Sequence, residues 1–158
     1  MEEIDWDNLD KYVVKGTCME VEKKYFRLTS APNPEAVRPE PVLRKALAFV
    51  KSKWKDAPNY EYTVDQLKSI RQDLKVQHLN NEFAVDVYET NARISLENGD
   101  INNFNQCQIA VKDLYAEGVP GNHAEFAAYR IMYTAFYLNS NRGMSKLLQD
   151  LGKENRCA

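Results

Sequence analysis

Three stretches decide the fold: KGTC at residues 15–18, EKKYFRLT at residues 22–29 and VRPEPVL at residues 37–43. The second stretch mixes acidic and basic residues in the manner of a short helix, and prolines interrupt the chain after it. Pro39 has a fixed backbone angle that suits the first turn of a helix, so a long helix is expected to open there. The sequence therefore predicts an N-terminal arm with a short helix, over residues 1–38, that lies against a helical body.

Helical periodicity dominates the rest of the chain. Apolar residues recur at helical spacing in five segments, at about 39–55, 63–74, 84–98, 101–114 and 122–136. Thr63 and Gln66 have the spacing of a capping box, and Gly99 is placed to end a helix. A last short helix is expected over residues 144–151. Short connections favour antiparallel neighbours, so we expect one all-α domain over residues 39–152, made of antiparallel helical hairpins in a TPR-like superhelix.

Two further motifs complete a pattern of known type, SIRQDL at residues 69–74 and YETNARI at residues 88–94. Together with the N-terminal stretches they resemble the Sac/GANP homology family, which is related to the PCI proteins of mRNA export and processing. Within that family the chain is similar to the branch of leukocyte-receptor-cluster member eight. The likeness runs from about Trp6 to about Tyr137. It implies a helical repeat of the Sac/GANP or PCI type.

Members of this family normally carry further helices and a winged-helix module. Nothing in this sequence resembles that module, so we expect the chain to be the N-terminal helical part of a longer protein. The segment at 122–136 fits this expectation, because it is apolar on nearly all sides and needs neighbours on both sides. The short helix at 144–151 is the other candidate to cover it.

The resemblance also implies a function. It indicates a protein-interaction scaffold of a PCI-type complex in mRNA processing, export, splicing or transcription-coupled steps. The implied partners are a PCI-type subunit like those of the COP9 signalosome and, through the C-terminal region of the longer protein, the small acidic Dss/Sem protein. Such work implies a nuclear location, with the cytoplasm as the alternative.

The amino-acid composition narrows the class of protein independently of this resemblance. A chain of 158 residues suffices for one domain with one core. Its 21 basic and 23 acidic residues give a formal net charge of −2, which offers no bulk attraction to nucleic acid or to an anionic membrane. Cys18, Cys107 and Cys157 are odd in number and far apart, which favours free thiols in a reduced compartment. No segment approaches the roughly 20 apolar residues that cross a bilayer, so we expect a soluble protein.

No arrangement of residues predicts catalysis, a metal site or a cofactor. His78 and His123 have no acidic or thiol neighbours at metal-ligand spacing. Cys107 lies on an apolar stripe, where core packing is the commoner role of cysteine. Glu89 and Glu97 can share a helix face, but carboxylates on a charged surface are usually solvated. The glycines form no phosphate-binding loop. We therefore expect a protein that is not an enzyme.

Four residues in the two family motifs are expected to hold helices together: Arg71, Asp73, Glu89 and Arg93. Arg71 lies at the edge of an apolar helix face, and a partly buried arginine needs carboxylate or carbonyl partners. We expect a structural network of ion pairs and hydrogen bonds between the helices at 63–74 and 84–98. The alternative is that Arg71 contacts a partner protein.

Basic residues gather between positions 38 and 55, where Glu40 is the single acid: Arg38, Arg44, Lys45, Lys51, Lys53 and Lys55. Arg44, Lys51 and Lys55 share one stripe of a helix. Such a stripe can bind phosphates, and Tyr60 and Tyr62 are candidates for base stacking or partner contact. Weak direct binding of RNA or single-stranded DNA is therefore the alternative to the scaffold. The plain explanation is the solvated side of an amphipathic helix.

Overall fold

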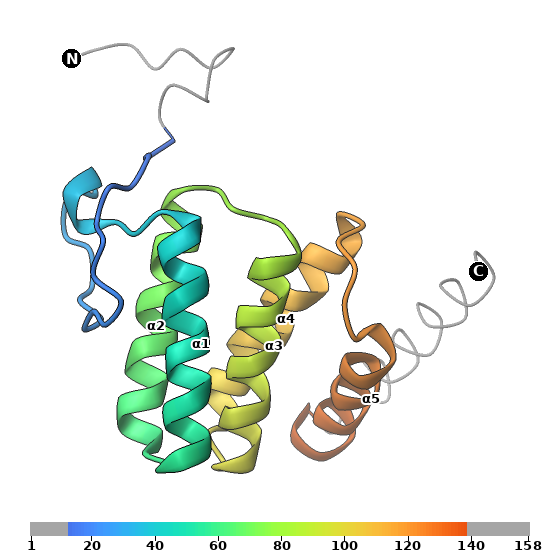
Figure 1. Ribbon diagram of the computed structural model, residues 1–158. Coiled ribbons are helices and arrows are strands. Elements are labelled where there is room, and N and C mark those ends of the chain that lie inside the picture. The colour runs from blue at the N-terminus through green and yellow to red at the C-terminus, as the bar shows by residue number, and fades with distance from the viewer. Residues whose placement is uncertain (1–12, 139–158) are drawn as a thin grey trace.

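Figure 1 shows the computed structural model of the chain, which describes residues 13–138. Within this range the protein is all-helical and has no strand, which confirms the predicted fold class. The elements are η2 (Pro34–Ala36), α1 (Glu40–Asp56), α2 (Tyr60–Val76), α3 (Glu82–Glu97), α4 (Ile101–Ala116), α5 (His123–Tyr133) and the π-helical turn η3 (Thr134–Leu138).

Successive helices lie side by side as antiparallel hairpins (Figure 1). α1 packs on α2, α2 on α3, and α3 and α4 share the most extensive contact. α5 follows α4 and packs against it less extensively. The hairpins agree with the prediction, whereas the TPR-like superhelix and the limits of the domain remain predictions. The expected helix at 144–151 lies outside the described residues.

Side-chain caps set where α2, α3 and α4 begin, and one of these caps differs from the prediction. α2 begins at Tyr60, because the side chain of Asn59 accepts a hydrogen bond from the backbone N–H of Tyr62 at 3.1 Å. Asparagine is among the best capping residues, so it starts the helix before Thr63 is reached. Thr63 is instead buried inside the helix, and its assignment as the cap was wrong. Gly99, with a φ of 71°, ends α3 as expected.

The apolar stripes of the helices form two adjoining cores. The larger core joins α1, α2 and α3 through residues such as Leu43, Leu67 and Val87. The smaller core joins α3, α4 and α5 around Cys107 and Phe126, so Cys107 packs as predicted. No helix within residues 13–138 is long and apolar enough to cross a membrane.

The arm is extended where the sequence predicted a short helix. Residues 22–29 are not helical, and the regular structure that the arm does contain is the short turn η2. Side chains of α2 bind the arm's backbone: Gln66 accepts from the N–H of Lys23 at 3.2 Å, and Gln72 donates to the carbonyl of Phe26 at 2.9 Å. The backbone N–H of Lys23 and the backbone carbonyl of Phe26 are therefore bonded to side chains of α2. The prediction of a helix over residues 22–29 was wrong.

The first part of the arm is held against the segment that leads into α1. The backbone N–H groups of Thr17 and Cys18 donate to the carbonyls of Pro34 and Val37, both at 2.9 Å. Gly16 lies so close to this segment that an added Cβ atom would stand 2.2 Å from the carbonyl oxygen of Val37. Only a residue without a side chain fits this contact.

Replacing Gly16 with alanine should therefore loosen the arm. We expect Gly16→Ala to lower the free energy of unfolding by about 1 to 3 kcal/mol, because the backbone must shift to admit the methyl group. Urea denaturation measures this loss, and trypsin should cut faster after Lys23 and Lys24. Thr17→Ala is the matched control, since the Thr17 side chain is exposed. Equal stability of the two variants would contradict the close contact.

Candidate functional site

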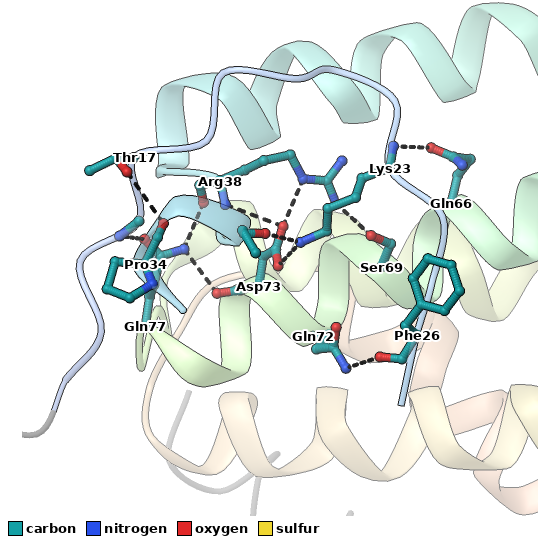
Figure 2. Close-up of polar contacts among 12 residues, drawn as sticks. Thr17, Lys23, Phe26, Pro34, Arg38, Gln66, Ser69, Gln72, Asp73 and Gln77 are labelled. Atoms are coloured by element: carbon teal, nitrogen blue, oxygen red, sulfur yellow. Dashed lines mark hydrogen bonds and ion pairs between the residues drawn. The ribbon is translucent and has the colours of Figure 1, made fainter. Parts of the chain in front are cut away.

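A buried cluster of charges joins the arm to α2 (Figure 2). Asp73 is 1% exposed, and its two carboxylate oxygens meet Arg38 Nε at 2.7 Å and Lys23 Nζ at 2.6 Å. Arg38 is fully buried; its guanidinium also donates to the Ser69 hydroxyl and to the carbonyl of Val21, both at 2.9 Å. Charges removed from water are costly unless they are paired and hydrogen-bonded, and each of these has such partners.

Gln77 completes the cluster at the end of α2. Its side-chain N–H group donates to the carbonyls of Arg38 at 2.7 Å and Asp73 at 2.9 Å. Its side-chain oxygen accepts from the backbone N–H of Gly16 at 3.1 Å. Three separate points of the arm and its continuation, at Gly16, Lys23 and Arg38, are thus bonded to side chains of α2 or of its C-cap residue Gln77.

Four residues of α2 and its C-cap that hold the arm share one helix face: Gln66, Ser69, Asp73 and Gln77. Gln72, which also bonds to the arm, lies on a neighbouring face. Because the four residues are three and four positions apart, their polar side chains form one stripe along the helix. A helix face that is covered by another segment is more commonly apolar. Sequence reasoning identified Asp73 but missed the other three. The helical spacing of these polar residues was the signal that could have found them.

Arg38 was expected to contact a partner or nucleic acid, and the structure contradicts this role. Its side chain is buried beneath the arm, so no phosphate or partner reaches it. Asp73 does belong to a structural network, but its partners are Arg38 and Lys23 and not Arg71. Arg71 donates to Cys107 Sγ at 2.8 Å and lies over the ring of Tyr88, with no ion pair among residues 13–138.

A second buried carboxylate, Glu89, fixes the start of α5. It accepts hydrogen bonds from the Tyr115 hydroxyl and from the backbone and side-chain N–H groups of Asn122, the N-cap residue of α5. Arg93 pairs with Glu89 at 3.1 Å and with Glu125 at 2.7 Å. Glu89 and Arg93 thus belong to a network that joins α3 to α5, whereas the sequence predicted a network between the helices at 63–74 and 84–98.

The pKa values in this second cluster follow from its contacts. Burial raises the pKa of Glu89, yet the hydrogen bonds from Tyr115 and Asn122 outweigh it and leave the pKa below its ordinary value. Burial and the neighbouring Glu89 raise the pKa of Tyr115. The hydrogen bond to Glu125 raises the pKa of Arg93. The cluster is therefore a charged network at neutral pH.

The basic stripe of α1 is largely paired with acids. Arg44 meets Glu40 at 2.5 Å, and Lys51 meets Asp86 of α3 at 2.8 Å. Lys53 likewise meets Glu22 of the arm at 3.0 Å. Lys45 and Lys55 are exposed, and neither forms an ion pair within the described part of the chain. A contact role for the exposed members stays a prediction, but the stripe carries less free charge than the sequence indicated.

Tyr60 and Tyr62 are both engaged within the protein. The Tyr60 hydroxyl donates to Asp100 at 2.7 Å, and burial raises the pKa of Tyr60 to about 12. The Tyr62 hydroxyl donates to Glu22, and Lys53 Nζ lies 4.6 Å from the centre of its ring. Their expected roles in stacking or partner contact therefore remain predictions.

Histidine and cysteine side chains are the remaining candidates for metal and thiol chemistry. Among residues 13–138, no group of three or more His, Cys, Asp or Glu side chains is placed to hold a metal ion. Cys107 is buried, and burial raises the pKa of its thiol, which disfavours the nucleophilic thiolate. His123 stacks on Tyr115 with ring centres 3.8 Å apart. Cys107 and His123 are thus engaged in packing.

Comparison with known proteins places this geometry in a family. The sequence model of the SAC3/GANP family matches residues 14–98, which include most of the arm and α1 to α3. SAC3 family protein A of Arabidopsis thaliana is 51% identical over 99% of this chain. A THP3 homologue of Schizosaccharomyces pombe is 50% identical over 94%, and a leukocyte receptor cluster member 8 homologue of Xenopus laevis is 51% identical over 87%.

These relatives are much longer than the chain. It spans 15% of the Arabidopsis protein, 38% of the Schizosaccharomyces protein and 17% of the Xenopus protein. The matching part of each relative therefore corresponds to the arm and the helical hairpins, and the remainder of each relative lies outside this comparison.

Removing the buried carboxylate of Asp73 should destabilise the fold strongly. We expect Asp73→Asn to lower the free energy of unfolding by about 3 to 5 kcal/mol, because it leaves the buried Arg38 without its counter-charge. The control is Asp86→Asn, which breaks the exposed pair with Lys51 and should cost less than about 1 kcal/mol. Urea denaturation of both variants gives the comparison, and similar losses would contradict the structural importance of the cluster.

The Glu89 cluster should make stability depend on pH. Because the folded pKa of Glu89 lies below its ordinary value of 4.5, its ionised form stabilises the protein at neutral pH, and this contribution disappears as the pH falls below 4.5. The difference in unfolding free energy between the parent and Glu89→Gln should therefore shrink on acidification.

Chemical denaturation at several pH values between 7 and about 3 measures that difference. Glu97→Gln is the control, because Glu97 is exposed and its substitution should change stability by less than about 0.5 kcal/mol at neutral pH. A Glu89→Gln difference that stays constant or grows in acid would refute the assignment.

Proposed function

The chain belongs to the SAC3/GANP family, and we propose on this premise that it acts as a protein-interaction scaffold of a PCI-type complex. The complex would serve mRNA processing, export or transcription-coupled steps. The observation that carries the proposal is the family match over residues 14–98, since these residues contain the arm, α1, α2 and the buried cluster that unites them.

The architecture supports a scaffold because its buried carboxylates bind other parts of the same chain. Both buried carboxylates, Asp73 and Glu89, fix segments to one another. Several large apolar side chains nevertheless remain exposed on the arm, α4, α5 and η3, among them Phe26, Ile109 and Phe136. Exposed apolar side chains of this size, where they gather, are typical of protein contact surfaces.

The proposed partner is a PCI-type subunit that resembles those of the COP9 signalosome. The small acidic Dss/Sem protein is proposed as a second partner, through regions outside this chain, and the proposed location is the nucleus. Direct binding of RNA through α1 is less well supported, because Arg44 and Lys51 of the basic stripe are paired with acids.

Co-expression of the full-length protein with its candidate PCI-type subunit tests the scaffold. We expect a stable complex in size-exclusion chromatography with light scattering, and we expect it to survive the triple substitution Arg44→Glu, Lys51→Glu and Lys55→Glu. RNA anisotropy at two salt concentrations provides the second measurement. Absence of the complex, together with tight RNA binding that the triple variant loses, would replace the scaffold with the nucleic-acid interpretation.

A further inference from the structure

A groove runs along α2, between the arm on one side and α4 on the other. Tyr25 and Leu28 of the arm form one wall, and Ile109 of α4 forms the other, with Lys68, Arg71 and Lys75 of α2 between them. A second hollow lies under the arm and shares Leu28, Gln72 and Val76 with the first. We call the first hollow the arm–α2–α4 groove; the second hollow adjoins it at the three shared residues.

The groove contains three cations that have no acidic partner among residues 13–138. Lys68, Arg71 and Lys75 follow one another at spacings of three and four, so they share a face of α2. None of them forms an ion pair with another residue in the 13–138 range, in contrast to Arg44 and Lys51 of α1.

Three acidic residues stand near these cations and only partly offset them: Asp113, Asp100 and Asp65, which lies three positions before Lys68 and accepts from the backbone N–H of Tyr25 at 3.4 Å. Asp113 lines the groove on the α4 side. Asp100 lies near Lys68, but its carboxylate already accepts a hydrogen bond from the Tyr60 hydroxyl at 2.7 Å. Three cations against one acid in the lining leave the groove with positive charge, although the chain as a whole carries −2.

Exposed aliphatic side chains accompany the cations. Ile109 is 52% exposed and Leu28 is 44% exposed, although both lie in a hollow next to other apolar groups such as Val76. Water contact with such side chains is unfavourable, and burial of each under a ligand would contribute binding free energy. The groove thus offers charge and apolar surface together.

We propose that the arm–α2–α4 groove binds an acidic amphipathic peptide segment of a partner protein. Carboxylates of the segment would pair with Lys68, Arg71 and Lys75, and its apolar side chains would cover Leu28 and Ile109. Amphipathic segments recognise grooves in this way, through apolar anchors at helical spacing. The inference rests on the proposed scaffold function. It assigns that function a binding surface and states the chemical character of the partner segment.

A single-stranded nucleic acid fits the groove less well. Such ligands need open aromatic faces on which bases stack. Tyr25 and Tyr88 line the groove but are both half-buried, and the guanidinium of Arg71 already lies over the Tyr88 ring at 6.0 Å from the ring centre. The exposed walls at Leu28 and Ile109 are aliphatic, which favours a peptide with apolar side chains.

Selection from a display library of random peptides of about 16 residues, about four helical turns, tests the proposal without a known ligand. The bait is the 158-residue chain, and selected peptides are measured by fluorescence anisotropy. We expect enriched peptides to combine aliphatic residues with several carboxylates, and the double variant Lys68→Glu, Lys75→Glu to bind them at least about tenfold more weakly. Ile109→Gln should also weaken binding.

The control variant carries the same change of charge elsewhere: Lys45→Glu with Lys55→Glu, on exposed positions of α1. It should bind the selected peptides as the parent does, and circular dichroism should show that all variants retain their helices. No enrichment, enrichment of peptides without carboxylates, or equal weakening by both double variants would overturn the proposal.

Oligouridine in the same assay separates the two classes of ligand. Tighter binding of oligouridine than of any selected peptide, lost in the Lys68 and Lys75 variant, would also overturn the proposal in favour of RNA. A failure of the groove would leave the complex with the PCI-type subunit intact in size-exclusion chromatography. A failure of the scaffold itself would abolish that complex, so the two failures are distinguishable.

Discussion

The buried ion pair between Arg38 and Asp73 is the constraint on which the arrangement of the arm depends. A guanidinium that is fully out of water requires a carboxylate and further acceptors, and here they come from α2 and from the arm itself. Arg38 immediately precedes Pro39 and α1, so pairing it with Asp73 fixes the entry of the first long helix against α2. Lys23 of the extended arm pairs with the same carboxylate, so the arm covers Arg38 and Asp73.

Because of this ion pair, the irregular arm has a fixed position on the surface of the molecule. Because side chains of α2 bind its backbone, the arm keeps one course along the helix and forms a wall of the arm–α2–α4 groove. At the opposite end of the helical body, Glu89 performs a similar task by holding the start of α5. The family match ends at residue 98, so it includes Glu89 and Arg93 but not their partners on α5. In the proposed scaffold, buried charged residues thus hold the arm and the start of α5 against the helical hairpins.

Helical periodicity and turn residues were enough to predict the helical hairpins, because apolar spacing and a residue such as Gly99 are local signals. The arm was not predictable in that way: residues 22–29 mix charges as a surface helix does, and only contacts with α2, more than forty positions away, make them extended. Charge counting likewise placed Arg38 in the group of basic residues between positions 38 and 55, although its burial depends on Asp73, which is distant in sequence. Asp73, Glu89 and Arg93 were identified as structural, but their partners follow from the packing of the helices and not from spacing within one of them.

Native-state hydrogen exchange of the unmodified protein tests the central claim most directly. The backbone N–H groups of Thr17, Cys18 and Lys23 are bound to Pro34, Val37 and Gln66, and each bond depends on the arm being fixed by the Asp73 cluster. If the cluster joins the arm to the fold, these amides should be protected nearly as strongly as those in the middle of α2 and should exchange through the same opening. Exchange of the arm amides at the rate of an unstructured chain, while α2 stays protected, would contradict the account.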